Sequence, residues 1–419
     1  MKRNKSLAFA VAVVAASALF VTAVPANAAG VDLRIGTVQP MSGAGFAAYG
    51  TGLANAAAFG VTSVQAAMTA NGVAGSCKMI AQEDSVSDAP SVVREAATKL
   101  VKSDKVNVII GSLTSGASLE VGTVVASSTG VVAIASAASS PSLTTFKDND
   151  TLFRTYPSDL LQAVALVKAV SKAYGNSSWV TVGAINNSFG TGLATAFKRA
   201  WIKNGGHIGG TVLWNAGAAS YDSEAAALVK TKHNAFVFVD YPDSFAKMAP
   251  ALARTKKWDQ AATFMTEAFN DDSAIATVGA SLMNGIRGTS AKTNGTDAAG
   301  WKTAFTAAYP KNPGTFVDGS GFDAAVLACL AGISAGGTSA KALAKGLRNV
   351  GGVNGGTAYS WKELNAAVKD VAAGKPVTYN GVWGYTKFDK AGDPMGGAFE
   401  VWSVKSGVII HDSKQDVQF

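Results

Sequence analysis

The residues on which most metal and nucleophile chemistry depends are scarce in this chain. Its 419 residues include three histidines and two cysteines, and the histidines lie in unrelated contexts without metal-ligand spacing. The sequence has no H-E-x-x-H motif, no C-x-x-C motif and no G-x-x-x-x-G-K-[ST] phosphate loop. These absences disfavour an enzyme, and we expect neither a metal nor a cofactor.

Basic runs and low-complexity linkers are also missing. The formal net charge is +8, but the lysines and arginines are scattered singly or in pairs such as Lys198-Arg199. A nucleic-acid site needs concentrated positive charge, so we expect no nucleic-acid partner. Hydrophobic residues make up 48% of the chain and charged residues 15%. This composition indicates a large globular protein, and the length suggests two domains.

The N-terminus has the pattern of an export signal. Lys2, Arg3 and Lys5 precede an almost unbroken apolar stretch over residues 7–24, and Ala26-Asn27-Ala28 forms a small-x-small cleavage site. A transmembrane anchor is the alternative, but Pro25 and Asn27 end the apolar run without a stop-transfer pattern. We therefore expect residues 1–28 to be a signal peptide and the mature protein to be periplasmic or secreted.

Two cysteines in an exported protein allow one disulfide. Cys77 precedes an expected strand and Cys329 lies in an apolar helical stretch, far away in the sequence. A buried free thiol at Cys329 is an equally good interpretation. The sequence does not decide between them.

Strand-like apolar runs alternate with helical patterns along the chain. The first part has expected strands at 33–38, 79–82, 106–110 and 131–134, and helices at 52–70, 90–101 and 117–127, with Asp88 as a cap of the second helix. This βαβ order predicts a parallel sheet covered by helices on both faces. The pattern restarts, which predicts a second α/β lobe, with helices at 159–174, 190–204, 222–231 and 243–254 and strands at 179–185, 207–213 and 235–239.

Loops at the ends of expected strands carry the candidate binding residues. The G-A-G-F-A-A segment at 43–48 looks like a degenerate dinucleotide fingerprint, but an exported location argues against that cofactor. Small and hydroxyl residues fill the loops at 111–116 and 136–141, where ligands of open parallel sheets bind. Their backbone N–H groups and hydroxyls can hold an anion near a helix N-terminus. Alternatively, Ser115 and Ser139 are ordinary helix N-caps.

The combination of these segments resembles the periplasmic leucine/isoleucine/valine-binding protein family. The resemblance is carried in the first lobe by L-R-I-G-T-V-Q-P-M-S-G, Tyr49-Gly50, A-Q-E-D-S-V-S-D-A-P, V-N-V-I-I-G-S and I-A-S-A-A-S-S-P. It continues in family order through Phe153-Arg154-Thr155, Asn187-Ser188-Phe189-Gly190, Phe264-Met265-Thr266-Glu267 and Tyr379-Asn380-Gly381 followed by Phe388-Asp389. It covers essentially the whole mature chain.

The resemblance implies an α/β fold of two Rossmann-like lobes with parallel sheets, the type I periplasmic-binding-protein fold. Three crossings would join the lobes, near Thr155, Arg287 and Trp383. The N-terminal lobe would then combine residues 29–155 with 288–382, and the C-terminal lobe would combine 156–287 with 383–419. The lobes would close around a ligand like a flytrap.

The resemblance also assigns ligand contacts. Ser115 and Ser139 match residues that hold an amino acid's α-carboxylate, Ala137 offers a carbonyl to the ammonium, and Glu267 matches the carboxylate that pairs with the ammonium. A helix-start role is the alternative for Glu267. Phe189 stands where branched-chain binders have a tyrosine, and Thr114 stands where some relatives have a cysteine, which excludes their disulfide. Further candidate wall residues are Phe46, Tyr49, Tyr241 and Trp383.

The expected function is that of an extracytoplasmic solute-binding protein. It would act as a monomer and deliver an amino acid, aliphatic or otherwise apolar, to an ABC permease whose ATPase is a separate chain. The alternatives are a binder of amides, urea or aromatic acids on the same fold, a ligand-sensing partner of a membrane receptor, and, less favoured, a secreted hydrolase. Which small molecule binds is beyond the sequence.

Overall fold

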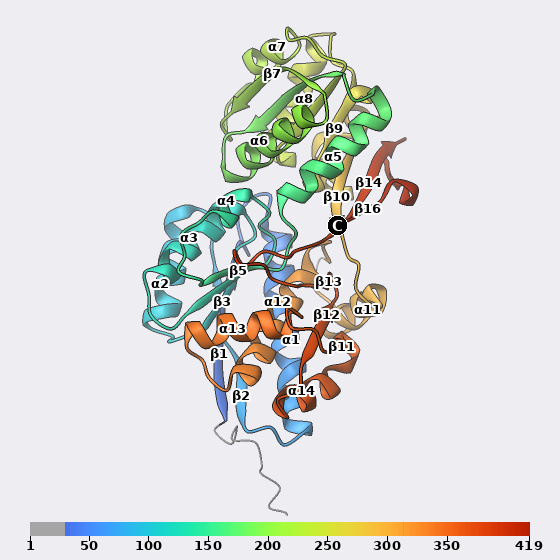
Figure 1. Cartoon of the computed structure of the whole chain (residues 1–419). Helices are drawn as coiled ribbons and strands as arrows, with labels where there is room; N and C mark the ends of the chain where they lie inside the picture. Colours follow the sequence, from blue (N-terminus) through green and yellow to red (C-terminus); the bar gives the residue numbers. More distant parts are fainter. Residues whose placement is uncertain (1–29, 313) are drawn as a thin grey trace, which may run out of the picture.

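The computed structural model describes residues 30–312 and 314–419, and it shows two α/β lobes stacked end to end (Figure 1). The expected signal peptide, residues 1–28, lies outside the described residues. Among the described residues, no single helix is long and apolar enough to cross a membrane, while one pair bent by 110°, Asp318–Ala335 with Ala340–Val350, passes on length and composition alone.

The first lobe is built on a five-stranded parallel sheet in the order β2-β1-β3-β4-β5. Its strands are short and apolar, and β3 and β4 are buried throughout, as expected for a sheet covered on both faces. The elements are β1 (Val31–Gln39), α1 (Ala47–Ala70), β2 (Gly75–Asp84), α2 (Pro90–Lys102), β3 (Val108–Gly111), α3 (Ser115–Ala126), β4 (Val132–Ala135), α4 (Pro141–Thr144) and β5 (Leu152–Arg154).

The second lobe has a sheet in the order β15-β14-β10-β9-β8-β6-β7, with β16 paired to β14. The core strands β6 to β10 are parallel, and β14 joins β10 antiparallel. The elements are α5 (Asp159–Tyr174), β6 (Trp179–Ile185), α6 (Ser188–Lys203), β7 (His207–Trp214), α7 (Asp222–Leu228), β8 (Ala235–Val239), α8 (Pro242–Arg254), η1 (Gln260–Ala262), β9 (Thr263–Met265), η2 (Glu267–Phe269), α9 (Asp272–Val278), α10 (Ala280–Met283), β10 (Arg287–Lys292), β14 (Ala398–Lys405), β15 (Val408–His411), η4 (Ser413–Gln415) and β16 (Val417–Gln418).

The segment between β10 and β14 returns to the first lobe, where α12 packs against α1 (Figure 1). A Cβ on Gly321 of α12 would lie 2.6 Å from the carbonyl oxygen of Leu53, so only glycine permits this approach of the two helices. The segment comprises α11 (Ala298–Ala308), α12 (Asp318–Ala335), α13 (Ala340–Val350), β11 (Thr357–Ser360), η3 (Trp361–Glu363), α14 (Leu364–Ala372), β12 (Val377–Gly381) and β13 (Gly384–Tyr385).

Two of the crossings between the lobes lie at other residues than expected, as the sheet to which each strand belongs shows. Arg287 begins β10, which pairs with β9 and β14 of the second sheet, so the chain crosses after Lys292 and not near Arg287. Trp383 lies between β12 and β13 in the small sheet of the first lobe. The third crossing therefore comes later, between Gly392, which accepts a hydrogen bond from Arg154 of β5, and Ala398 at the start of β14.

Three helices start two or more residues earlier than expected, including α6, which begins at Ser188 and not at residue 190. Helix α1 begins at Ala47 and not at residue 52, because the glycine turn at 43–45 ends just before two good helix formers, Ala47 and Ala48. Helix α3 begins at Ser115 and not at residue 117, because the Thr114 hydroxyl accepts a hydrogen bond from the Ala117 amide and caps it.

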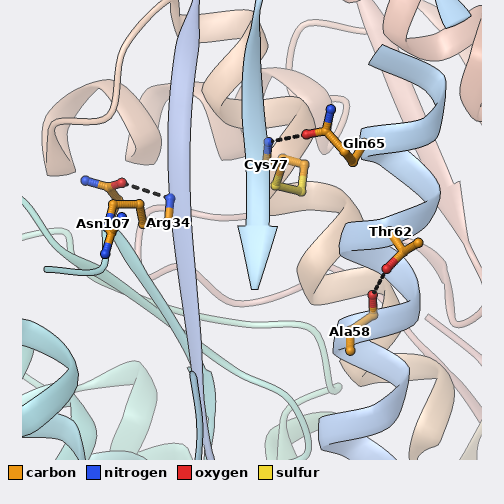
Figure 2. The surroundings of a disulfide bond; sticks show 7 residues. Arg34, Ala58, Thr62, Gln65, Cys77 and Asn107 are labelled. Atoms are coloured by element: carbon orange, nitrogen blue, oxygen red, sulfur yellow. Dashed lines mark hydrogen bonds between the residues drawn. A yellow bond between two sulfur atoms is a disulfide. The ribbon is translucent and has the colours of Figure 1, made fainter. Parts of the chain in front are cut away.

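The cysteines form a disulfide that ties β2 to α12 (Figure 2). Cys77 lies inside β2, whereas the sequence analysis placed it just before the strand. Its amide donates to the Gln65 side chain of α1. The two residues are 252 apart in sequence. The bond therefore fixes the late helices to the first sheet and closes a very long loop of the unfolded chain.

We expect the disulfide to stabilise the first lobe. The double substitution Cys77→Ala/Cys329→Ala should lower the free energy of unfolding by about 2–5 kcal/mol, because the unfolded chain regains the freedom that the cross-link removes. Denaturant unfolding of both forms measures this. A reductant should lower the melting temperature of the unsubstituted protein and leave that of the double variant unchanged; equal stability of the two proteins would contradict the prediction.

Candidate functional site

A cavity of about 600 Å³ lies between the lobes, at the carboxyl ends of strands from both sheets. This is where open parallel sheets place their ligands. Both lobes contribute walls. Nine of the ten sequence-predicted site residues line it, namely Phe46, Tyr49, Thr114, Ser115, Ala137, Ser139, Phe189, Tyr241 and Glu267.

Trp383 is not among the lining residues. Its side chain is buried in the first lobe, with the ring centroid 4.9 Å from that of Tyr156, and its amide donates to Asp323 of α12. The sequence analysis made Trp383 a candidate wall residue. An aromatic residue near a crossing can contact a ligand or pack in the core, and the sequence does not distinguish these two roles. Tyr156 takes that place and contacts the cavity itself.

The hydroxyl loops of the first lobe are held so that two serines face the cavity. The helix caps are the neighbouring residues, Thr114 for α3 and Ser140 for α4, so the N-cap alternative for Ser115 and Ser139 is wrong. Ser115 Oγ accepts from the Ser140 amide at 3.2 Å, which leaves its O–H free to donate. Hydroxyl donors and the N-terminus of α3 thus meet at one side of the cavity and suit an anion.

Asp88 stabilises the loops on this side of the cavity through hydrogen bonds. It does not cap α2, whose N-cap is Ala89 without a side-chain bond, so that expectation was wrong. Its carboxylate instead accepts from the Ser85 and Ser112 hydroxyls at 2.6 Å each and from the Thr114 amide at 2.8 Å. These bonds join the loop after β2 to the loop after β3, and they satisfy a buried carboxylate without a cation.

Glu267 supplies the opposite side of the cavity from the second lobe. Its side chain points to α5, where Oε2 accepts from Gln162 Nε2 at 2.6 Å, and Glu267 is also the first residue of the three-residue η2. Burial raises the pKa of Glu267 to about 7, although the Gln162 bond works in the opposite direction. An ammonium group placed here would pair with the ionised carboxylate.

Aromatic rings form the remaining walls. Phe189 and Tyr241 stack with centroids 5.3 Å apart, and Phe46 of the first lobe meets Tyr241 edge-on at 5.2 Å. Tyr49 packs edge-on against Phe316 at 6.0 Å. Burial, and then the charge of Asp271, raises the pKa of Tyr49 to about 12, so it stays neutral. Such walls favour an apolar group.

Sequence reasoning missed several lining residues. They include Leu113, Tyr156, Tyr221, Asp243, Ser244, Lys247, Ser273, Thr277 and Phe316. Tyr156 follows the Phe153-Arg154-Thr155 segment directly, so its position beside the first crossing was a usable signal. Phe316 had none, because only the return of the late segment to the first lobe brings it to the cavity.

The lobes touch beside the cavity. Ser140 Oγ of the first lobe donates to the carbonyl of Ser188, the first residue of α6, at 2.7 Å. A Cβ on Gly192 of the same helix would lie 2.5 Å from that hydroxyl oxygen. This second contact, like the pair formed by Phe46 and Tyr241, depends on how closely the lobes approach each other.

Among residues 30–312 and 314–419, no group of three His, Cys, Asp or Glu residues is arranged to hold a metal ion. A G-x-S-x-G pattern does occur at 332–336. Its serine lies within α12, away from the cavity, and not on the strand-to-helix turn that exposes a hydrolase nucleophile.

Comparisons with known proteins agree with this architecture. A curated relative, the chemotactic signal transduction system substrate-binding protein BasB of Halobacterium salinarum, is 25% identical over 378 residues, which are 88% of this chain and 86% of the relative. Among solved structures, the leucine binding protein LivK of Thermotoga maritima gives a TM-score of 0.71 at 18% identity, with 91% of this chain and 98% of that chain covered.

Other solved structures of this fold carry different ligands. The substrate binding protein LivJ of Streptococcus pneumoniae in complex with isoleucine gives a TM-score of 0.68 at 18% identity, covering 93% and 100% of the two chains. A solute binding protein of R. palustris in complex with benzoate gives 0.65 at 21%, covering 91% and 95%. These likenesses establish the type I periplasmic-binding-protein fold.

The family itself follows from a match over most of the chain. The sequence model described as "Periplasmic binding protein" matches residues 32–379. With its two lobes and the cavity between them, the chain belongs to the periplasmic binding protein family, whose members are substrate-binding proteins.

Proposed function

We propose that this protein binds an amino acid with an apolar side chain between its lobes and delivers it to an ABC permease. The observation that carries the proposal is the polarity of the cavity. Hydroxyls and the α3 N-terminus stand on one wall, and the buried Glu267 carboxyl stands on another, between aromatic surfaces. A zwitterion with an apolar side chain satisfies both ends, because a charge closed away from water needs a partner.

The specific contacts follow from this orientation. Ser115 and Ser139 donate to the ligand carboxylate, with Thr114 beside them at the helix start. Glu267 and the Ala137 carbonyl receive the ammonium, and Phe46, Tyr49, Phe189 and Tyr241 contact the side chain. Ligand contacts from both lobes favour the closed arrangement, so binding shifts the population of lobe orientations. The closed form is then the one that the permease recognises.

Sensing is the second candidate function. The BasB relative is named as part of a chemotactic signal transduction system and matches 88% of this chain. The same closure would then be read by a membrane receptor. Aromatic acids are the other ligand class, as in the benzoate complex of the R. palustris protein, but a ligand without an amine leaves Glu267 unpaired.

Removing the charge of Glu267 should abolish tight binding of amino acids. Glu267→Gln keeps the shape of the side chain, and loss of one partner of a buried pair costs about 3–5 kcal/mol, or roughly a hundred- to several-thousand-fold in Kd. Titration calorimetry with leucine, isoleucine, valine and phenylalanine measures this. The exposed Glu95 of α2 provides a matched control, and Glu95→Gln should bind like the unsubstituted protein. Unchanged affinity of Glu267→Gln would sink the ammonium assignment.

A side chain at Gly192 should hinder closure without touching the ligand. Gly192→Leu would push against Ser140 of the other lobe, and a tenfold loss of the closed population raises Kd about tenfold. Calorimetry gives the Kd, and small-angle scattering shows whether ligand still makes the protein more compact.

Gly337 serves as the matched control for this substitution. It follows α12, does not line the cavity, and a Cβ there meets only Ala342 Cβ at 3.9 Å. Gly337→Leu should therefore bind and close normally. Normal closure of Gly192→Leu would show that the lobes do not approach along this line.

A further inference from the structure

Two buried carboxyl groups, Asp159 and Glu267, lie close enough to interact, and among the described residues no cation forms an ion pair with either. Asp159 is fully buried and Glu267 is 8% exposed. Asp159 stands one helical turn before Gln162 on the same face of α5, and Gln162 holds Glu267. The nearby Arg154 guanidinium is already committed to Asp393 at 2.6 Å and to the Ser140 carbonyl.

Such a pair cannot carry two negative charges. Ionising a buried carboxyl loses hydration, and a second charge nearby adds repulsion, so at least one proton stays. Asp159 has the Ser139 hydroxyl beside it and does not line the cavity. Glu267 lines the cavity and accepts from Gln162, which favours its charged form. Glu267 is therefore the group that exchanges its proton, while Asp159 keeps its own.

The electrostatic surroundings of the two groups agree with this assignment. Burial raises the pKa of Glu267 to about 7. Burial, and next the charge of Glu267, raises the pKa of Asp159 well above its usual value, while Arg154 opposes the shift. Burial raises the pKa of the neighbouring Tyr156 and Tyr241 far above the ordinary value of a tyrosine, so both stay neutral, and Glu400 of β14 lies close enough to act on Tyr156.

Gln162 is placed to set the ionisation of Glu267. Its amide nitrogen donates both to Glu267 Oε2 at 2.6 Å and to the Thr289 carbonyl of β10 at 3.2 Å. The bond to the Thr289 carbonyl fixes the orientation of the amide group, so that its nitrogen, which can only donate, faces the Glu267 carboxyl. Gln162 itself is 1% exposed and does not line the cavity. It acts on the ligand only through Glu267.

We propose that this site binds its ligand in exchange for a proton, and that Gln162 is the positioning residue that sets the pH of the exchange. The protonated Glu267 carboxyl releases one proton to solvent, and the resulting carboxylate pairs with the ligand's ammonium. The inference rests on the proposed amino-acid function and extends it. The site then selects for a protonated amine: a carboxylate ligand without an amine leaves Glu267 neutral and binds better at low pH, the opposite dependence.

The test is calorimetry from pH 5.5 to 8.5, with proton release measured below pH 7 in phosphate and in Bis-Tris, whose different ionisation enthalpies reveal it. The probes are leucine and phenylalanine, with 4-methylpentanoate and benzoate as amine-free counterparts. Since only the ionised site binds an amine, Kd should rise about tenfold per pH unit below pH 7 and level off above it. About one proton should leave per ligand below pH 7.

Three variants separate the roles. Glu267→Gln should give a flat, weak profile. Gln162→Leu removes the bond that favours the charged form, so the rise in Kd should begin at higher pH, which a merely structural role would not produce. Asp159→Asn mimics a carboxyl that is always protonated and should leave the pH dependence of Kd unchanged. If Asp159→Asn shifts that dependence, the exchanged proton belongs to Asp159 and the assignment to Glu267 is overturned.

The outcomes distinguish this inference from the proposed function. Tight amino-acid binding with a flat pH profile and no proton release would overturn proton exchange and leave the function intact. Binding of benzoate or 4-methylpentanoate alone, stronger at low pH, would overturn the amino-acid function itself. Should no probe with an amine bind at any pH, both proposals fail.

Discussion

One buried arginine holds the cavity loop to the connections between the lobes. Arg154, at the end of β5, is 1% exposed; its guanidinium bonds Asp393 at 2.6 Å, Thr144 Oγ1 at 2.9 Å and the Ser140 carbonyl at 2.9 Å. Asp393 belongs to the segment that leads to the third crossing, and Ser140 follows the Ser139 of the cavity wall. A buried charge that loses its partner costs about 3–5 kcal/mol. The bonds of Arg154 therefore keep β5, the segment around Asp393 and the loop at Ser140 in contact.

This constraint explains how the loops that line the cavity keep fixed positions although the chain forms two separate lobes. The loop at 136–141 is fixed from within the first lobe by Arg154, and Asp88 fixes the neighbouring loop through Ser112 and Thr114. The late helices are fixed to the same lobe by the disulfide between Cys77 and Cys329. Between the lobes, side chains such as Ser140 and Phe46 make the contacts beside the cavity.

Much of the fold and of the cavity wall could be predicted from the sequence, because both depend on local patterns. Buried parallel strands such as β8 are continuous apolar runs, and loops after such strands face the ligand, which located Ser115 and Ser139. The crossings depend on which sheet a strand joins, and Arg287 and Trp383 carry no local mark of that choice. Gln162 was missed for the same reason, since its partner Glu267 lies 105 residues away in sequence.

The charges around the cavity argue for a ligand that carries both signs. A helix N-terminus provides about half a positive charge, and hydroxyl donors add to it, so the wall at Ser115 suits an anion without a lysine or arginine. Glu267 needs a cation, or else keeps its proton. A ligand with only a carboxylate uses the first wall and a ligand with only an amine uses the second, whereas an amino acid uses both and leaves its side chain to the aromatic rings. The geometry that separates these two walls therefore also orients the ligand.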